Sequence, residues 1–266
     1  MTGPSPDHSR RSVPTVAITG ASGSLGRALL QAWHGQGARL LALCHGEAPL
    51  ELTDNQGQPV PLEQVRWQVG REEELRARLQ EVDILVLNHG VNVYGRRDAE
   101  AVACSLEVNA LSSWRLLELF ASVVQERSPA QSGTRPRAEV WLNTSEAEIQ
   151  PALSPLYEIS KRLVGQLLSL RALDLAGPHL RLRRLVLGPF RSALNPIGLM
   201  GSGFVARQIL RQARWDLGLI IVTPNPLTYL LMPLACLGRW SYYRLCGLAK
   251  LDGPAERGAE LRTPGP

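Results

Sequence analysis

Aromatic side chains are scarce in this chain, at 5% of its 266 residues, although 44% of the residues are hydrophobic. A platform that stacks the bases of single-stranded nucleic acid needs more aromatic rings than this composition supplies. The net charge of +5 comes from basic residues scattered singly among acids, with no basic run of the kind that binds nucleic acid. We therefore expect no nucleic-acid partner.

Cysteine is also rare, and its positions are dispersed. The chain has no Cys-x-x-Cys pair and no cysteine–histidine spacing of the zinc-binding type, because its four cysteines stand at Cys44, Cys104, Cys236 and Cys246. This argues against a disulfide framework and against a metal site, and it favours a reducing compartment. Residues 1–13 contain no apolar stretch of the secretory type, so we expect a flexible lead and a cytoplasmic protein.

Short apolar segments alternate with longer segments of helical character from residue 14 to residue 223. Strands are expected at Thr15–Thr19, Arg39–Cys44, Val65–Val69, Asp83–Leu87, Glu139–Asn143, Leu182–Leu187 and Leu219–Thr223. Helices are expected at Leu25–Gln36, from Arg71, at Asp98–Gln125 and at Pro155–Leu173. This alternation predicts one α/β domain over 14–223, with a doubly wound parallel sheet of the Rossmann type and helices on both faces. Such a sheet binds its ligand at the carboxyl ends of the strands.

The first predicted strand leads directly into a glycine-rich turn, Gly20-Ala21-Ser22-Gly23-Ser24-Leu25-Gly26, which opens a helix. Glycine permits a close backbone approach that a Cβ would block. The helix N-terminus supplies free N–H groups for a pyrophosphate. We therefore expect cofactor contacts from Gly20, Ser22, Gly23, Ser24, Leu25 and Gly26. The alternative is a tight strand–helix turn that binds no ligand.

The segment after the second predicted strand should contact the cofactor ribose. A ribose-binding acid is expected about 20 residues after the glycine turn. The sequence has His45 and Gly46 there, with Glu47 as a late candidate for the acid and no arginine for a 2′-phosphate. We expect His45 to contact the cofactor, and the choice between NAD and NADP stays open.

A tyrosine and a lysine, Tyr157 and Lys161, are spaced four residues apart on the predicted helix Pro155–Leu173, and Ser145 follows the preceding strand. The spacing places the phenol and the ammonium group on one helical face. A neighbouring cation lowers the pKa of a phenol, which can then exchange a proton with an alcohol or carbonyl oxygen. The serine hydroxyl can hydrogen-bond the same oxygen. An isolated match is typically a solvated helix face, whereas three matches on the expected elements favour a catalytic site.

Together these motifs resemble those of the short-chain dehydrogenase/reductases, over about residues 14–223. The glycine spacing is that of extended and atypical members of the family. Further matches are Asn88-His89-Gly90 after the fourth strand, Asn109 on the long helix, and Gly188-Pro189-Phe190-Arg191-Ser192 after the sixth strand.

The resemblance implies roles for individual residues. By it, Tyr157 is the catalytic acid/base, Lys161 binds the nicotinamide ribose and Ser145 polarises the substrate carbonyl. Asn109 would hold a water of the proton relay and complete the catalytic set. The implied cofactor contacts in this part of the chain are Asn88, His89, Gly90, Tyr157, Lys161, Gly188, Pro189 and Ser192.

The sequence departs from the family pattern at several positions. His89 replaces a small residue beside the cofactor, where it either donates a hydrogen bond or fills space. Ser145 is followed by Glu146 and Glu148, which bring carboxylates to the site entrance, and Thr144 is the alternative hydroxyl. The order Gly188-Pro189 is the inverse of the family's order.

A second resemblance is to dehydrogenase domains associated with sterol-desaturase-like membrane enzymes in cyanobacteria. The segments NHGVNVYG, WLNTSEAE and GPFRSALNPIG carry this likeness. The chain has no histidine boxes for a di-iron site, so the desaturase part is absent from it.

A charge-free stretch runs from Leu217 to Gly238, close to the C-terminus. Its length suggests a membrane span, but three prolines, Pro224, Pro226 and Pro233, argue against one continuous helix. The aromatic residues that follow, with basic neighbours, suit a helix lying on a membrane. For the extension 224–250, three readings stay open: packing on the core or on a second subunit, peripheral membrane contact through 227–250, and a true span. A disordered tail is expected over 251–266.

The leading hypothesis is an NAD(P)-dependent oxidoreductase that interconverts a carbonyl and an alcohol on a hydrophobic small molecule. Residues expected to line its substrate site are Leu194, Ile197, Leu199, Met200 and Phe204. The alternative is a non-catalytic NAD(P)-binding sensor or scaffold on the same fold. An epimerase or dehydratase for nucleotide sugars is a third hypothesis, although little chain remains after Arg184 for a substrate domain. A homo-oligomer is also expected.

Overall fold

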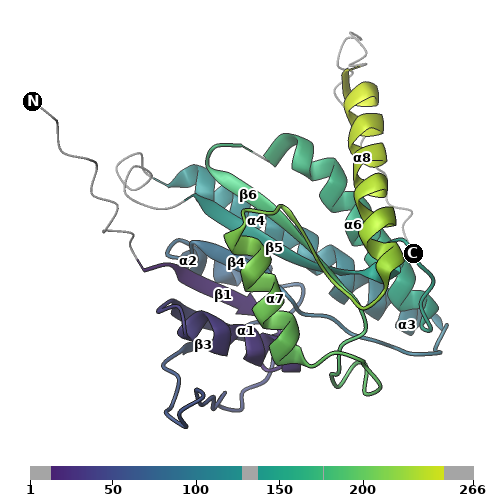
Figure 1. The fold of residues 1–266 in the computed structure, drawn as a ribbon. Coiled ribbons are helices and arrows are strands. Elements are labelled where there is room, and N and C mark those ends of the chain that lie inside the picture. Colours follow the sequence, from purple (N-terminus) through teal and green to yellow (C-terminus); the bar gives the residue numbers. More distant parts are fainter. Residues whose placement is uncertain (1–12, 128–136, 176, 249–266) are drawn as a thin grey trace, which may run out of the picture.

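The computed structural model describes residues 13–127, 137–175 and 177–248. Seven parallel strands form one sheet in the order β3-β2-β1-β4-β5-β6-β7 (Figure 1). The strands are β1 (Thr15–Thr19), β2 (Arg39–Cys44), β3 (Glu63–Arg66), β4 (Ile84–Leu87), β5 (Ala138–Ser145), β6 (Leu180–Leu187) and β7 (Leu219–Val222). The expected N-terminal lead, apart from Val13, and the expected tail over 251–266 lie outside the described residues.

The doubly wound sheet predicted from the alternation of apolar segments is confirmed. The chain enters at β1, moves outward to β3, and returns to β4 on the other side of β1. The reversal opens a crevice at the carboxyl ends of β1 and β4, which is where ligands bind in such sheets. Strand β3 begins two residues earlier than expected, because its polar sequence EQVR on the sheet edge lacks the apolar signal of the central strands.

Helices cover both faces of the sheet. On one face, α1 (Ser24–His34) and α7 (Ser202–Arg214) pack against each other and over the central strands. On the other face lie α2 (Arg76–Leu79), α4 (Ser112–Glu126) and α6 (Pro155–Leu175). The sequence analysis did not predict α7, although Val205, Ala206, Ile209 and Leu210 give it a buried face.

The long helix expected over Asp98–Gln125 is present but interrupted. It consists of α3 (Ala99–Leu106), a π-helical turn η2 (Glu107–Leu111), and α4. The Asp98 side chain caps its start by accepting a hydrogen bond from the backbone N–H of Ala101 at 3.0 Å. A π-helical turn inside an α-helix is frequent at functional sites, and this one contains the buried Asn109.

The charge-free stretch Leu217–Gly238 is not one continuous helix, as its prolines predicted, because β7 ends at Val222 and α8 (Pro226–Leu248) begins at Pro226. Pro226 stands in the first turn, where a missing N–H costs nothing, whereas Pro233 lies inside α8 and removes one internal hydrogen bond without breaking the helix. Thr228 and Met232, which are fully buried in the turns before Pro233, fix the helix to the body. None of the described helices is long and apolar enough to cross a bilayer.

Candidate active site

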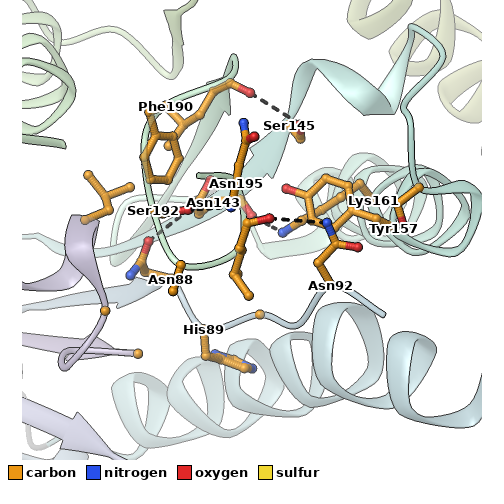
Figure 2. A pocket seen from close by; sticks show the side chains of 18 of the residues that line it. Asn88, His89, Asn92, Asn143, Ser145, Tyr157, Lys161, Phe190, Ser192 and Asn195 are labelled. Atoms are coloured by element: carbon orange, nitrogen blue, oxygen red, sulfur yellow. Dashed lines mark hydrogen bonds between the residues drawn. The ribbon is translucent and has the colours of Figure 1, made fainter. Parts of the chain in front are cut away.

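A cavity of about 1110 Å³ opens at the carboxyl edge of the sheet. Its walls come from the turn after β1, the loop after β4, the end of β5, the start of α6 and the segment after β6 (Figure 2). Of the residues expected to bind or to catalyse, the cavity is lined by Gly20, Ser22, Gly23, Ser24, Leu25, His45, Asn88, His89, Gly90, Ser145, Tyr157, Lys161, Gly188, Pro189 and Ser192. The other two, Gly26 and Asn109, lie outside it.

The glycine turn brings the start of α1 close to the loop after β4. Gly20 has a φ of +60°, and a Cβ there would lie 2.9 Å from the Cα of His89. Only glycine fits this position without strain. No side chain caps the start of α1, so its first N–H groups remain available to an anion. Gly26 instead packs the helix against the backbone of Gly20 and Ala21.

His89 is built into the scaffold of this crevice. The Thr19 hydroxyl oxygen accepts hydrogen bonds from the backbone N–H groups of Asn88, at 2.8 Å, and His89, at 3.2 Å. The same oxygen lies 2.8 Å from Nδ1 of His89, whose ring contacts the edge of Trp67. Burial lowers the pKa of His89 to about 3, so the imidazole is neutral at physiological pH. The neutral ring therefore fills the space beside Trp67, and its hydrogen-bonding contact is with Thr19 inside the scaffold.

Ser145 and Tyr157 meet at the end of β5. The Ser145 hydroxyl donates to the backbone oxygen of Leu187 at 3.3 Å and accepts from the backbone N–H of Ala147 at 3.2 Å. Burial raises the pKa of Tyr157, the hydrogen bond with Ser145 acts to lower it, and the charge of Glu146 acts to raise it. The pKa of this phenol is therefore above its usual range in this arrangement.

The expected lowering of the Tyr157 pKa by Lys161 is thus wrong for this cavity. The Lys161 ammonium nitrogen lies 5.6 Å from the centre of the Tyr157 ring and donates to the backbone oxygen of Asn143 at 3.0 Å. Lys161 is itself buried, and desolvation lowers its pKa to about 8 although the charge of Glu148 opposes this. Burial is the largest influence on the pKa of both groups.

Asn109 fixes the wall of the cavity without lining it. Its amide oxygen accepts from the backbone N–H of Val91 at 2.7 Å, and its amide nitrogen donates to the backbone oxygen of Val91 at 2.9 Å. The amide nitrogen also donates to the Ser160 hydroxyl at 3.0 Å. The side chain therefore links the loop after β4 to the π-helical turn and to α6, which is a positioning role.

Two polar residues that line the cavity, Asn143 and Glu146, were not predicted from the sequence to bind a ligand. Asn143 donates from its side chain to Oδ1 of Asn88 at 2.9 Å (Figure 2). The strand period of two offered a signal, because Asn143 precedes Ser145 by two residues and so shares its face. Glu146 lines the cavity, and its Oε2 accepts hydrogen bonds from Thr223 at 2.6 Å and Thr228 at 3.2 Å.

The mouth of the cavity is bridged by polar contacts and edged by apolar side chains. The Asn92 side chain donates to the backbone oxygen of Leu194 at 3.3 Å, and the Tyr94 hydroxyl donates to that of Ala193 at 3.2 Å. Leu153 is 96% exposed there, and Ile197 is 78% exposed.

Of the apolar residues expected to line the substrate site, Leu194 and Ile197 line the cavity. Leu199, Met200 and Phe204 do not, because the chain turns away from the cavity after Ile197 and Met200 packs against the core. Among the described residues, no group of three or more His, Cys, Asp or Glu side chains is arranged to hold a metal ion.

The comparison with curated proteins supplies one informative relative. Monoglucosyldiacylglycerol epimerase from Synechocystis sp. is 43% identical to this chain over 221 residues. The match covers 82% of this chain and 51% of the epimerase, so the chain spans about half the length of this relative. No protein-family model matches the sequence.

Solved structures share the architecture at low sequence identity. A short-chain dehydrogenase from Sphingobium yanoikuyae in complex with NADPH aligns over 92% of this chain and 100% of its own, with a TM-score of 0.66 and 19% identity. A short-chain dehydrogenase from Burkholderia cenocepacia in complex with NADP gives the same coverages and TM-score at 17% identity. The chain therefore shares the fold of these short-chain dehydrogenases.

Proposed function

We propose that this chain catalyses the NAD(P)-dependent interconversion of a secondary alcohol and a carbonyl, with Tyr157 as the acid/base. One observation carries the proposal: Tyr157, Ser145 and Lys161 line the same cavity as the glycine turn. A phenol, a hydroxyl and an ammonium group thus lie beside an anion-binding helix terminus, which is the chemistry that hydride transfer to a carbonyl needs.

The cavity suits a dinucleotide because its glycine turn permits close approach and the start of α1 offers hydrogen-bond donors. Gly20 leaves no room for a Cβ, and the uncapped start of α1 can hold a pyrophosphate. Both NADP-type complexes among the structural neighbours support the same cofactor class. When bound, the nicotinamide accepts or returns a hydride.

The residues of the chain then handle the proton. A phenol with a raised pKa is protonated at neutral pH, so Tyr157 is ready to give its proton to a carbonyl oxygen. The Ser145 hydroxyl hydrogen-bonds that oxygen as negative charge develops on it. Lys161 holds the ribose and adds positive charge beside the phenol, while Asn109 keeps the loop after β4 in place.

A second candidate function is epimerisation of a sugar carried on a lipid, and the 43% identity to the Synechocystis epimerase favours it. In this reaction a hydride would pass from the carbinol carbon to the bound nicotinamide and return to the opposite face of the carbonyl, so no net oxidation would occur. Tyr157 would take the hydroxyl proton in the first half of the reaction and give it back in the second.

The polarity of the cavity fits such a substrate. Asn92, Asn195 and Glu146 offer hydrogen-bonding groups for sugar hydroxyls within it, and Leu153 and Ile197 edge its mouth for an apolar tail. The apolar mouth supports the prediction of a hydrophobic substrate. The polar groups inside the cavity further favour an amphiphile, with a polar head and an apolar tail. The predicted homo-oligomer stays a prediction.

The test is to titrate the tryptophan fluorescence of the purified chain with NADH and NADPH. The chain is then incubated with monoglucosyldiacylglycerol and each oxidised cofactor. We expect saturable nucleotide binding together with a reduced nicotinamide or an epimerised glycolipid, detected by absorbance and by NMR of the sugar. Binding without turnover on this glycolipid or on a panel of alcohols would favour the sensor alternative. Absence of nucleotide binding would overturn both.

A further inference from the structure

The outward face of α8 is apolar along its whole length. The leucines on this face are each at least 40% exposed: Leu227, Leu230, Leu231, Leu234, Leu237 and Leu245. At about 3.6 residues per turn, they span roughly 120° of the helix circumference. Trp240 and Tyr242 add half-exposed aromatic rings along its flanks.

This face is not needed to hold the helix on the protein. Thr228 and Met232, on the opposite side of α8, are fully buried. Further along, Arg239 pairs with the buried Glu148 at 2.5 Å, and Glu148 also pairs with Arg184 at 2.6 Å. The helix is therefore anchored through its inner side, and its far end extends beyond the rest of the described chain (Figure 1).

The first turn of α8 is tied to the chain segment that leads to the mouth of the cavity. The Gln150 side chain donates to the Thr228 hydroxyl at 2.8 Å and accepts from the Asn225 side chain at 2.6 Å. These bonds place the segment that carries the exposed Leu153 beside the first turn of α8. Leu153 and Ile197 are exposed apolar side chains of the cavity mouth and form its apolar rim.

We propose that α8 and this apolar rim dock on a lipid bilayer, so that a lipid substrate enters the cavity directly from the membrane. The inference rests on the proposed function, and it adds that the substrate of that function lies in the bilayer. The helix lies in the interface with its leucines among the acyl chains, as interfacial helices do.

Three observations favour a bilayer over a second copy of the chain. The apolar face is wider than the narrow seam of a helix pair. Between Pro226 and Leu248 there is no acidic residue, and the exposed Arg244 lies 5.1 Å from the centre of the Trp240 ring, which suits an anionic lipid surface. A protein partner covering Leu153 and Ile197 would also block the mouth.

The test uses the full chain and sedimentation with phosphatidylcholine vesicles, with and without phosphatidylglycerol. We expect the wild type to sediment with vesicles, and more strongly with the anionic lipid. The double variant Leu230→Asp/Leu234→Asp should lower the vesicle affinity at least about tenfold. The matched control is Trp215→Asp/Leu217→Asp, whose side chains are 60% and 40% exposed in the turn before β7, and it should bind vesicles like the wild type.

Each other outcome decides between explanations. A wild type that stays in the supernatant, or an α8 variant that sediments normally, overturns the docking. A dimer by light scattering without vesicles, converted to a monomer by the α8 substitutions, assigns the face to a second copy instead. Titration with NADPH separates the two proposals, because vesicle binding without nucleotide binding refutes only the function, and the reverse result refutes only the docking.

Discussion

The ammonium group of Lys161 donates to the backbone oxygen of Asn143 at 3.0 Å, so the lysine on α6 is held by the strand that ends in Ser145. This bond sets the position of the charge 5.6 Å from the centre of the Tyr157 ring. Strand β5 therefore positions both partners of the phenol, the hydroxyl of Ser145 and, through Asn143, the ammonium.

Burial of Lys161 predicts a particular dependence of stability on pH. Its pKa is lowered from 10.5 to about 8, so the unfolded chain binds more protons than the folded chain between these values. The contribution of Lys161 to stability therefore rises as the pH goes from about 8 to about 10.5. In urea denaturation, the free energy of unfolding of the wild type should rise relative to that of Lys161→Met over this pH range, by up to about 3 kcal/mol. A difference that stays constant with pH would contradict the buried ammonium.

Glu72 predicts a pH dependence of the same sign in the acid range. Although burial acts to raise its pKa, hydrogen bonds from Arg115, Gly70 and Ser112 hold it at about 2. The stabilisation from this lowered pKa is complete above about 4.5 and is lost as the pH falls toward 2. Arg115→Met should reduce the free energy of unfolding at pH 7 by about 2 kcal/mol, with a smaller deficit near pH 2. Glu73→Gln, on the exposed side of the same turn, is the control and should change stability little.

Gly20 allows a test of whether the glycine turn binds the cofactor, and Gly37 provides a control with similar backbone geometry. Gly20 and Gly37 have φ values of +60° and +77°, but a Cβ at Gly37 meets nothing within 4 Å. Alanine at either position should cost about 1 kcal/mol or more of stability, because both are left-handed. Only Gly20→Ala should also lose NADPH affinity, measured by tryptophan fluorescence. Equal nucleotide affinities in the two variants would place the pyrophosphate elsewhere.

Asn109 should affect the cofactor through the loop that it holds. Asn109→Leu removes three hydrogen bonds that join Val91 and Ser160 to the π-helical turn. We expect a loss of about 1–3 kcal/mol in stability and weaker NADPH binding. Hydrogen exchange should show faster exchange at Val91, with unchanged exchange in β7. Unchanged protection at Val91 would contradict the positioning role.

The sequence predicted the central architecture well, for physical reasons that differ between elements. The strands β1 and β2 agree with their predicted bounds because buried strands of a parallel sheet are apolar throughout. The grouping of Ser145, Tyr157 and Lys161 followed from strand and helix periodicity, which fixes direction locally.

Other features depended on three-dimensional context. The prolines predicted the break between β7 and α8, but they did not predict that the helix continues through Pro233, where the neighbouring Met232 is fully buried. The raised pKa of Tyr157 depends on how deeply the phenol is buried, which the spacing to Lys161 does not contain. Gly26 matched the glycine motif but lies inside α1, where it lets the helix pack against the backbone of Gly20 and Ala21.

Hydride transfer by Tyr157→Phe tests the central claim most directly. The variant removes only the phenolic oxygen, so NADPH binding should persist while the rate of hydride transfer falls by roughly 10²–10⁴-fold. Tyr243→Phe is the matched control, because the hydroxyl of Tyr243 on α8 contacts only Gln166 among the described hydrogen bonds, and its rate should equal that of the wild type. A Tyr157→Phe variant that transfers hydride at the wild-type rate would contradict the assignment of the acid/base.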